Sequence, residues 1–158
     1  MSTVNGLPAH ILLNHFIVVL GPLTAILAII CTVWPAVRRR LIWLVLLLAV
    51  ITLVLTPLTA NAGEWLSGRP AISPSPVLTT HEELGETLVY LVAAQVAAIT
   101  LLAAVHIRQA RGHSVKFSLH AVVGVLVIAA AVATLAQTYR IGDSGARAAW
   151  QNVAAAAR

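Results

Sequence analysis

The sequence predicts an all-α protein: a transmembrane four-helix bundle of up-down topology, with a short interfacial helix at its C-terminal end. Three observations support this fold class. The 158 residues are 59% hydrophobic and only 9% charged, whereas a soluble domain carries about 25% charged residues. The apolar residues form four runs, each sufficient for the roughly 20 helical residues that cross a hydrocarbon core. The basic residues cluster at the ends of these runs, which is typical of membrane proteins.

The four spans are expected at about 9–34, 41–61, 84–106 and 117–138, in one membrane domain that covers residues 1–158. Each is expected to be helical because a segment surrounded by lipid must satisfy its backbone hydrogen bonds internally. The opening stretch "MSTVNGLPAH" has no basic region and no cleavage motif, so no secretory signal peptide is predicted. No internal repeat and no nucleic-acid motif are recognised.

The connection between the second and third spans, over about 61–86, is predicted to be a long loop. Its prolines, among serine and glycine, interrupt helical hydrogen bonding at Pro70, Pro74 and Pro76. The third helix is then expected to start at a capping box, in which a threonine pairs with the glutamate three residues later, as Thr79–Glu82 or Thr80–Glu83.

Beyond the fourth span, Gly142 is expected to stop the helix. Asp143 or Ser144 is then expected to cap a short alanine-rich helix over about 145–157. Trp150 is suited to anchor that helix at the membrane surface.

Six of the ten basic residues fall in the first and third connections, at Arg38, Arg39, Arg40, Arg108, Arg111 and Lys116. The long second connection contains Arg69 alone. The positive-inside rule therefore predicts that the first and third connections are cytoplasmic and that both termini are extracytoplasmic.

Polar residues collect at the predicted outer end of the bundle. They include all five acidic residues of the chain, and comprise His10, Asn14, His15, Asn61, Glu64, His81, Glu82, Glu83, Glu86 and Asp143. His15 is placed about 10 Å inside the first span. Ionisable groups at such depth usually face the bundle interior and have a partner, so this end is the candidate site.

Helical geometry predicts how the first helix presents these groups. His10 and Asn14 share a face, whereas His15 lies about 140° around the helix from His10. His15 is therefore expected to work with a group from another helix, and His81 or Glu64 is the nearest candidate by depth. Gly85 follows His81 by one turn and leaves room beside that imidazole.

Three functions remain open on these residues, and no catalytic residue is assigned. One is a redox protein with haem b, in which His15 and His81 are axial ligands, Glu64 and Glu86 are their partners, and Gly85 gives space. The second is a non-haem transition-metal site, whose pool of ligands is His10, His15, Glu64, His81 and Asp143. The third is a hydrogen-bonded plug in an accessory subunit of a membrane complex.

Two further histidine patterns occur along the chain. "HEELGE" lacks the second histidine of H-E-x-x-H, since Gly85 occupies its position, so a zinc protease is not predicted. His106 and His120 end the third span and begin the fourth, where they can approach one another and form a second site at the inner end.

The stretches "GLPAHILLNHF", "HEELGE" and "GDSGARAAW" occur in this order along nearly the whole chain. Together they resemble a widespread family of small bacterial four-helix membrane proteins, classed as a domain of unknown function. The family typically reads His-Pro-Leu-x-x-His, then Gly-Glu, His-Glu-x-x-Gly and Gly-His-Ser-Gly-Ala. The resemblance implies functional positions at His10, His15, Glu64, His81 and Glu82.

The chain departs from the family pattern at two positions. His10 and His15 are differently spaced, with no proline after His10, and Asp143 stands where histidine is usual. The second departure weakens a haem ligand at the C-terminal position. The four spans predict a multi-pass protein in contact with the lipid bilayer. The resemblance implies that the membrane is the bacterial cell membrane, and that partners include membrane redox proteins, because some members look joined to Rieske-type domains.

Overall fold

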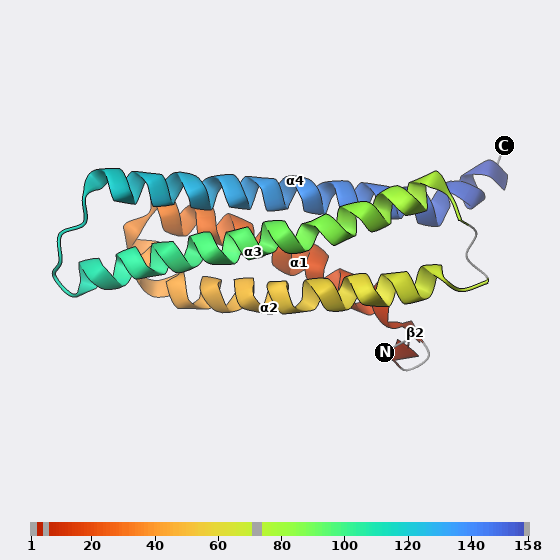
Figure 1. Ribbon diagram of the computed structural model, residues 1–158, viewed down its shortest axis with the longest axis horizontal. Helices are drawn as coiled ribbons and strands as arrows, with labels where there is room; N and C mark the ends of the chain where they lie inside the picture. The colour runs from red at the N-terminus through yellow and green to blue at the C-terminus, as the bar shows by residue number, and fades with distance from the viewer. Residues whose placement is uncertain (1–2, 5–6, 71–73, 157–158) are drawn as a thin grey trace.

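The computed structural model describes residues 3–4, 7–70 and 74–156 (Figure 1). Two strands of two residues each pair antiparallel at the N-terminal end and lead into four helices. The elements are β1 (Thr3–Val4), β2 (Leu7–Pro8), α1 (Ala9–Val33), α2 (Pro35–Ser67), α3 (Pro76–Ala110) and α4 (Phe117–Ala156).

The four helices run up and down and form one bundle, so the predicted architecture is confirmed (Figure 1). Helices α1 and α3 each pack against both α2 and α4, which makes α1 and α3 diagonal partners, and likewise α2 and α4. All four helices are long and apolar enough to cross a membrane. Large hydrophobic side chains on every helix point outward, as lipid contact requires. The chain is a multi-pass integral membrane protein.

The two ends of the bundle differ in the charge of their side chains. We call the end where α1 and α3 begin the acidic end, because it holds all five acidic residues: Glu64, Glu82, Glu83, Glu86 and Asp143. We call the opposite end the basic end, with Arg38, Arg39, Arg40, Arg108, Arg111 and Lys116. These residues come together because consecutive helices run in opposite directions.

The prediction of a long loop over 61–86 is wrong, since only residues 68–75 lie between α2 and α3. Helix α3 begins at Pro76, because proline is accommodated at the first helical position, where no backbone N–H is needed. Ser75 caps this helix through its hydroxyl, which accepts the N–H of Leu78 at 3.2 Å. The prediction that helix α3 starts at a capping box with Thr79 or Thr80 is therefore wrong as well. The polar residues of the acidic end lie on helices and not on a loop.

Helix α4 also runs further than expected. It continues through Gly142 to Ala156, so the helix does not stop there and no separate helix starts near residue 145. A glycine inside a helix costs only about 1 kcal/mol relative to alanine, which packing of the buried Ile141 and Ser144 against the bundle can offset. Residue 157 of the expected helix lies outside the described residues.

The buried core has two parts. The larger cluster occupies the middle and the basic half of the bundle, and includes Cys31, Ile42, Val45, Ile99 and Leu102. Cys31 is a buried free thiol that packs there, as expected. A smaller cluster lies toward the acidic end and consists of Ile17, Leu88, Val92 and Ile141. The second cluster forms the floor beneath the polar residues of that end.

Helices α2 and α4, which are diagonal partners, share a repeated pattern. Residues 49–56 read "AVITLVLT" and residues 131–138 read "AVATLAQT". The alanine and both threonines of each stretch are buried, at Ala49, Thr52, Thr56 and at Ala131, Thr134, Thr138. The same spacing then leads to Thr59 and Gly63 in α2 and to Ile141 and Gly145 in α4.

Helices α1 and α3 repeat in the same way. Each has a histidine in its first turns, His10 or His81, and a buried apolar residue seven positions later, Ile17 or Leu88. The two hairpins are therefore related by an approximate internal repeat, which the sequence alone did not reveal. The connections hide it, because Trp34 alone joins α1 to α2 whereas residues 111–116 join α3 to α4.

Candidate functional site

The polar residues of the acidic end divide into two groups. His10, Asn14, His81 and Gly85 face the interior, where they line one small cavity with Thr56, Thr59, Ile17, Leu88 and Ile141. His15, Glu64, Glu83, Glu86 and Asp143 are exposed, and Glu82 is partly buried outside the cavity. The cavity lies between the two hairpins, at the end of the smaller core cluster.

His10 joins α1 to α2. Its Nδ1 lies 2.9 Å from the backbone oxygen of Thr59. Its ring rests on Gly63, where a Cβ atom would come within 2.8 Å of Nδ1. The imidazole is thus held by a carbonyl and by the glycine one turn beyond it.

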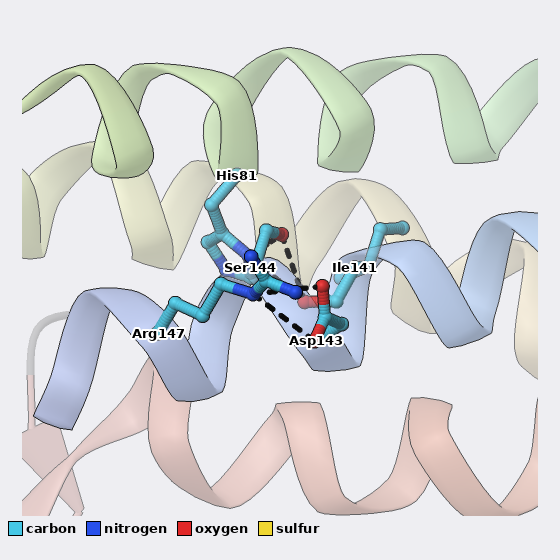
Figure 2. Close-up of polar contacts among 5 residues, drawn as sticks. All are labelled: His81, Ile141, Asp143, Ser144 and Arg147. Carbon is cyan, nitrogen blue, oxygen red and sulfur yellow. Dashed lines mark hydrogen bonds and ion pairs between the residues drawn. The ribbon is translucent and has the colours of Figure 1, made fainter. Parts of the chain in front are cut away.

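His81 joins α3 to α4 by the same construction (Figure 2). Its Nδ1 lies 3.1 Å from the backbone oxygen of Ile141 and 3.1 Å from the hydroxyl of Ser144. The Ser144 hydroxyl donates to the Ile141 oxygen, so it accepts from the imidazole. A Cβ atom at Gly145 would come within 2.9 Å of the His81 Cε1.

The two imidazoles contact one another across the diagonal of the bundle. Their ring centroids are 6.2 Å apart, and the ring planes are nearly perpendicular, at 87°. A backbone carbonyl can only accept a hydrogen bond, so the Nδ1 of His10 and the Nδ1 of His81 must both carry hydrogen. In the neutral imidazole this leaves the lone pair on Nε2. Among the contacts of the described residues, no hydrogen bond engages either Nε2.

The cavity between the histidines has a volume of about 40 Å³. A water molecule needs about 10–15 Å³ of such space, so a few waters or one metal ion fit without rearrangement. A haem is far larger, and would require α1 and α3 to separate. The residues at this position therefore suit a small ligand.

His15 lies away from this cavity. Its Nδ1 is 2.6 Å from the backbone oxygen of Ile11, one turn earlier in its own helix, and the side chain is exposed. The structure brings His10, not His15, to His81. A helix that places His10 and Asn14 toward the axis must turn His15 outward, by the same 140° offset expected from the sequence.

The carboxylates of the candidate set are also apart from the histidines. Asp143 forms an ion pair with Arg147, one turn along α4, at 3.0 Å (Figure 2). Glu64 and Glu86 are exposed on α2 and α3. Within the described residues, no group of three or more His, Cys, Asp or Glu side chains lies close enough to hold a metal ion. The structure thus brings together two of the five proposed ligands.

The residues that hold the two histidines were not predicted from the sequence. They are the glycines Gly63 and Gly145, the hydroxyl of Ser144 and the carbonyls of Thr59 and Ile141. A signal was present, because Gly63 and Gly145 lie in the motifs "AGEW" and "GDSGA". Glu64 and Asp143 are the predicted ligands in those stretches, whereas the small residues beside them make the contacts.

Comparisons with protein-family models, with curated proteins and with solved structures find no significant match to this chain.

Proposed function

We propose that this membrane protein binds one transition-metal ion at its acidic end, through the Nε2 atoms of His10 and His81. One observation carries the proposal: both Nδ1–H groups are already donated to carbonyl oxygens of neighbouring helices. Histidines that bind metals usually donate their other ring N–H in this way, because the bond orients the ring and raises the basicity of the ligating nitrogen.

The surroundings of the rings support the same proposal. Each imidazole packs against a glycine, Gly63 or Gly145, and donates its Nδ1–H to a carbonyl, so little side-chain freedom is lost when an ion binds. Asn14 lines the cavity as well and offers an amide oxygen as a third ligand. Imidazole nitrogen suits zinc, copper, iron and nickel. Copper(I) is our first choice, since two nitrogen ligands can satisfy it.

In this proposal the acidic end faces away from the cytoplasm. The basic end carries six of the ten basic residues, and such residues are retained on the cytoplasmic side during insertion. His10 and His81 would hold the ion there, and copper would supply single-electron chemistry for membrane redox proteins, the partners that the family resemblance implies.

Metal titration of the detergent-solubilised protein tests the proposal. Metal-free protein is loaded with Cu⁺ under anaerobic conditions, or with Zn²⁺, and the bound metal is counted by elemental analysis after desalting. We expect one ion per chain in the wild type, and at least tenfold weaker binding in His10→Ala and His81→Ala. His15→Ala is the matched control, because it removes an exposed imidazole from the same helix as His10.

Circular dichroism of each variant shows whether the helices are retained, so that lost binding is not mistaken for unfolding. Equal metal content in the wild type and in folded His10→Ala and His81→Ala would contradict the proposal. A Soret band whose α and β bands sharpen with dithionite would replace the metal ion by haem b. That outcome would also require the helices to separate around the histidines.

A second candidate function is supported by a different feature of the same residues. Each histidine bridges two helices, α1 to α2 and α3 to α4, and the rings meet between the hairpins. This arrangement suits a hydrogen-bonded plug that fixes helix packing in an accessory subunit, where such bonds contribute about 0.6 kcal/mol each. It predicts that His10→Ala lowers the thermal midpoint while neither it nor the wild type retains metal.

A further inference from the structure

The basic end contains a second and larger cavity, of about 420 Å³. It opens where α1 joins α2 and where α3 approaches α4, and its polar lining consists of Arg38, Arg39, His106, Gln109 and His120. Pockets for small molecules have volumes of about 300–1,000 Å³, so this one has room for a ligand. His106 and His120, which were expected at this end, both line the cavity.

Arg38 is the unusual residue of this cavity. Its side chain is buried, with 4% of the residue exposed, although arginine is almost never buried unless it is paired. Its terminal nitrogens lie 3.4 Å from His120 Nε2 and 3.4 Å from Gln109 Oε1, both at the long limit of hydrogen bonding. Its Nε is buried and has no partner among the described residues, and the same holds for Nδ1 of His120.

No aspartate or glutamate of this chain lies near Arg38 to neutralise it. All five acidic side chains lie at the acidic end, at the opposite end of the bundle. Arg39 also lines the cavity and adds a second positive charge. A buried charge without a counter-ion costs several kcal/mol, which a bound anion recovers.

We propose that this cavity binds a phosphate group, with Arg38 as the central ligand and Arg39 and His120 as its neighbours. The guanidinium presents N–H donors in a planar fork that matches two oxygens of a phosphate. The terminal nitrogens, whose present hydrogen bonds are at the long limit, supply that fork here. The site is independent of the histidine pair, and it remains if that pair binds no metal.

Two sources can supply such a phosphate: the headgroup of an anionic lipid or free inorganic phosphate. A lipid is accessible because the cavity lies at the end of the apolar helices, where headgroups meet the protein. Basic pockets between transmembrane helices recognise anionic headgroups. The recognised chemistry is the same in both cases, so the experiment must separate the two sources.

Native mass spectrometry of the detergent-solubilised chain tests the proposal directly. The protein is titrated with phosphatidylglycerol, and with phosphatidylcholine as the comparison, because its phosphate is neutralised by its own choline. The thermal midpoint is measured with and without inorganic phosphate. The variants are Arg38→Met and Arg39→Gln. Arg39 is exposed, so its replacement keeps the test valid if Arg38→Met fails to fold. Arg69→Gln is the matched control, since Arg69 lies at the other end and stacks on Trp65 at 3.8 Å.

We expect at least tenfold weaker anion binding in Arg38→Met, a smaller loss in Arg39→Gln and no change in Arg69→Gln. Retention of phosphatidylglycerol with no effect of phosphate identifies the lipid headgroup. A phosphate-dependent rise in the thermal midpoint, without preference for phosphatidylglycerol, identifies the free anion. If both ligands act, the lipid headgroup and the free ion compete for one site. Equal binding by the wild type and Arg39→Gln, or equal affinity for both lipids together with no effect of phosphate on the thermal midpoint, overturns the proposal.

Discussion

At each end of this bundle, two side chains from diagonal helices lie close together, but the two pairs differ in how well their N–H groups are satisfied. At the acidic end His10 of α1 meets His81 of α3, and at the basic end Arg38 of α2 meets His120 of α4. Each pair joins diagonal helices at matching positions of the internal repeat. The histidine pair is held by carbonyls and glycines around a cavity of about 40 Å³. The arginine lines a cavity of about 420 Å³, makes two hydrogen bonds at the long limit, and has an Nε with no partner among the described residues.

The difference follows from the charge of the side chains. A neutral imidazole needs one acceptor for its N–H, and a backbone carbonyl of the next helix provides it. A guanidinium is always charged and carries five N–H donors, which no neighbouring helix satisfies fully. The acidic end is therefore nearly complete without a ligand, while the basic end requires an anion. We therefore expect an added ligand to raise the free energy of unfolding more at the basic end than at the acidic end.

The largest effect is expected for Arg38→Met measured with and without phosphate or anionic lipid. At a ligand concentration of about 100 times Kd, the wild type gains about 2.7 kcal/mol in the free energy of unfolding, and the variant gains none. Without ligand, the variant is at least as stable as the wild type, because an unpaired buried charge is removed. Thermal denaturation in detergent measures both differences. If the ligand raises the free energy of unfolding of Arg38→Met as much as that of the wild type, the proposed difference between the two ends is wrong.

Gly145→Ala tests how tightly the acidic end is packed. The new Cβ would lie 2.9 Å from the His81 Cε1, so the ring must move and weaken its bonds to Ile141 and Ser144. Overpacking of this kind costs about 1–3 kcal/mol. Gly142→Ala is the control on the same helix, where a Cβ meets nothing within 4 Å and alanine should stabilise by roughly 0.5–1 kcal/mol. Equal thermal midpoints for the two variants would disprove this account.

A smaller effect on stability is expected when two buried glutamines, Gln137 and Gln95, are compared. Gln137 donates to the Leu84 oxygen at 2.8 Å and to the Thr87 hydroxyl at 2.6 Å, whereas the side-chain oxygen of Gln95 has no partner among the described residues. We expect Gln137→Leu to destabilise by about 0.6–1.5 kcal/mol, and Gln95→Leu to be neutral or stabilising. Denaturation of both variants in the same detergent makes the comparison. A greater loss of stability in Gln95→Leu than in Gln137→Leu would contradict this account of the two glutamines.

The smallest effect is expected for Asp143→Asn. This carboxylate pairs with Arg147 on the exposed face of α4, and exposed i,i+4 pairs contribute about 0.3–0.5 kcal/mol. Metal binding by the histidines should not change, because Asp143 lies outside their cavity. Elemental analysis of this variant beside His81→Ala checks the point. A loss of metal in Asp143→Asn would bring the aspartate back into the ligand set.

Much of the candidate site was predictable, but its pairing was not. The sequence placed His10, Asn14, His81 and Gly85 at one end of the bundle, and the structure gathers them around one cavity. It paired His15 with His81, because depth in the membrane was the only guide to which side chains meet. The sequence does not show how α1 is rotated about its own axis. Lipid-facing and buried positions are both apolar, so periodicity does not identify the inner face of α1.

The sequence by itself determined that four helices cross the membrane. Composition and run length suffice for this, because lipid leaves the backbone no alternative to internal hydrogen bonding. Tertiary structure alone decided that His10 meets His81, that Gly63 and Gly145 hold them, and that Arg38 is buried without a carboxylate. These features depend on which faces of diagonal helices meet at the bundle axis. That choice results from the packing of all four helices together, and no single helix encodes it.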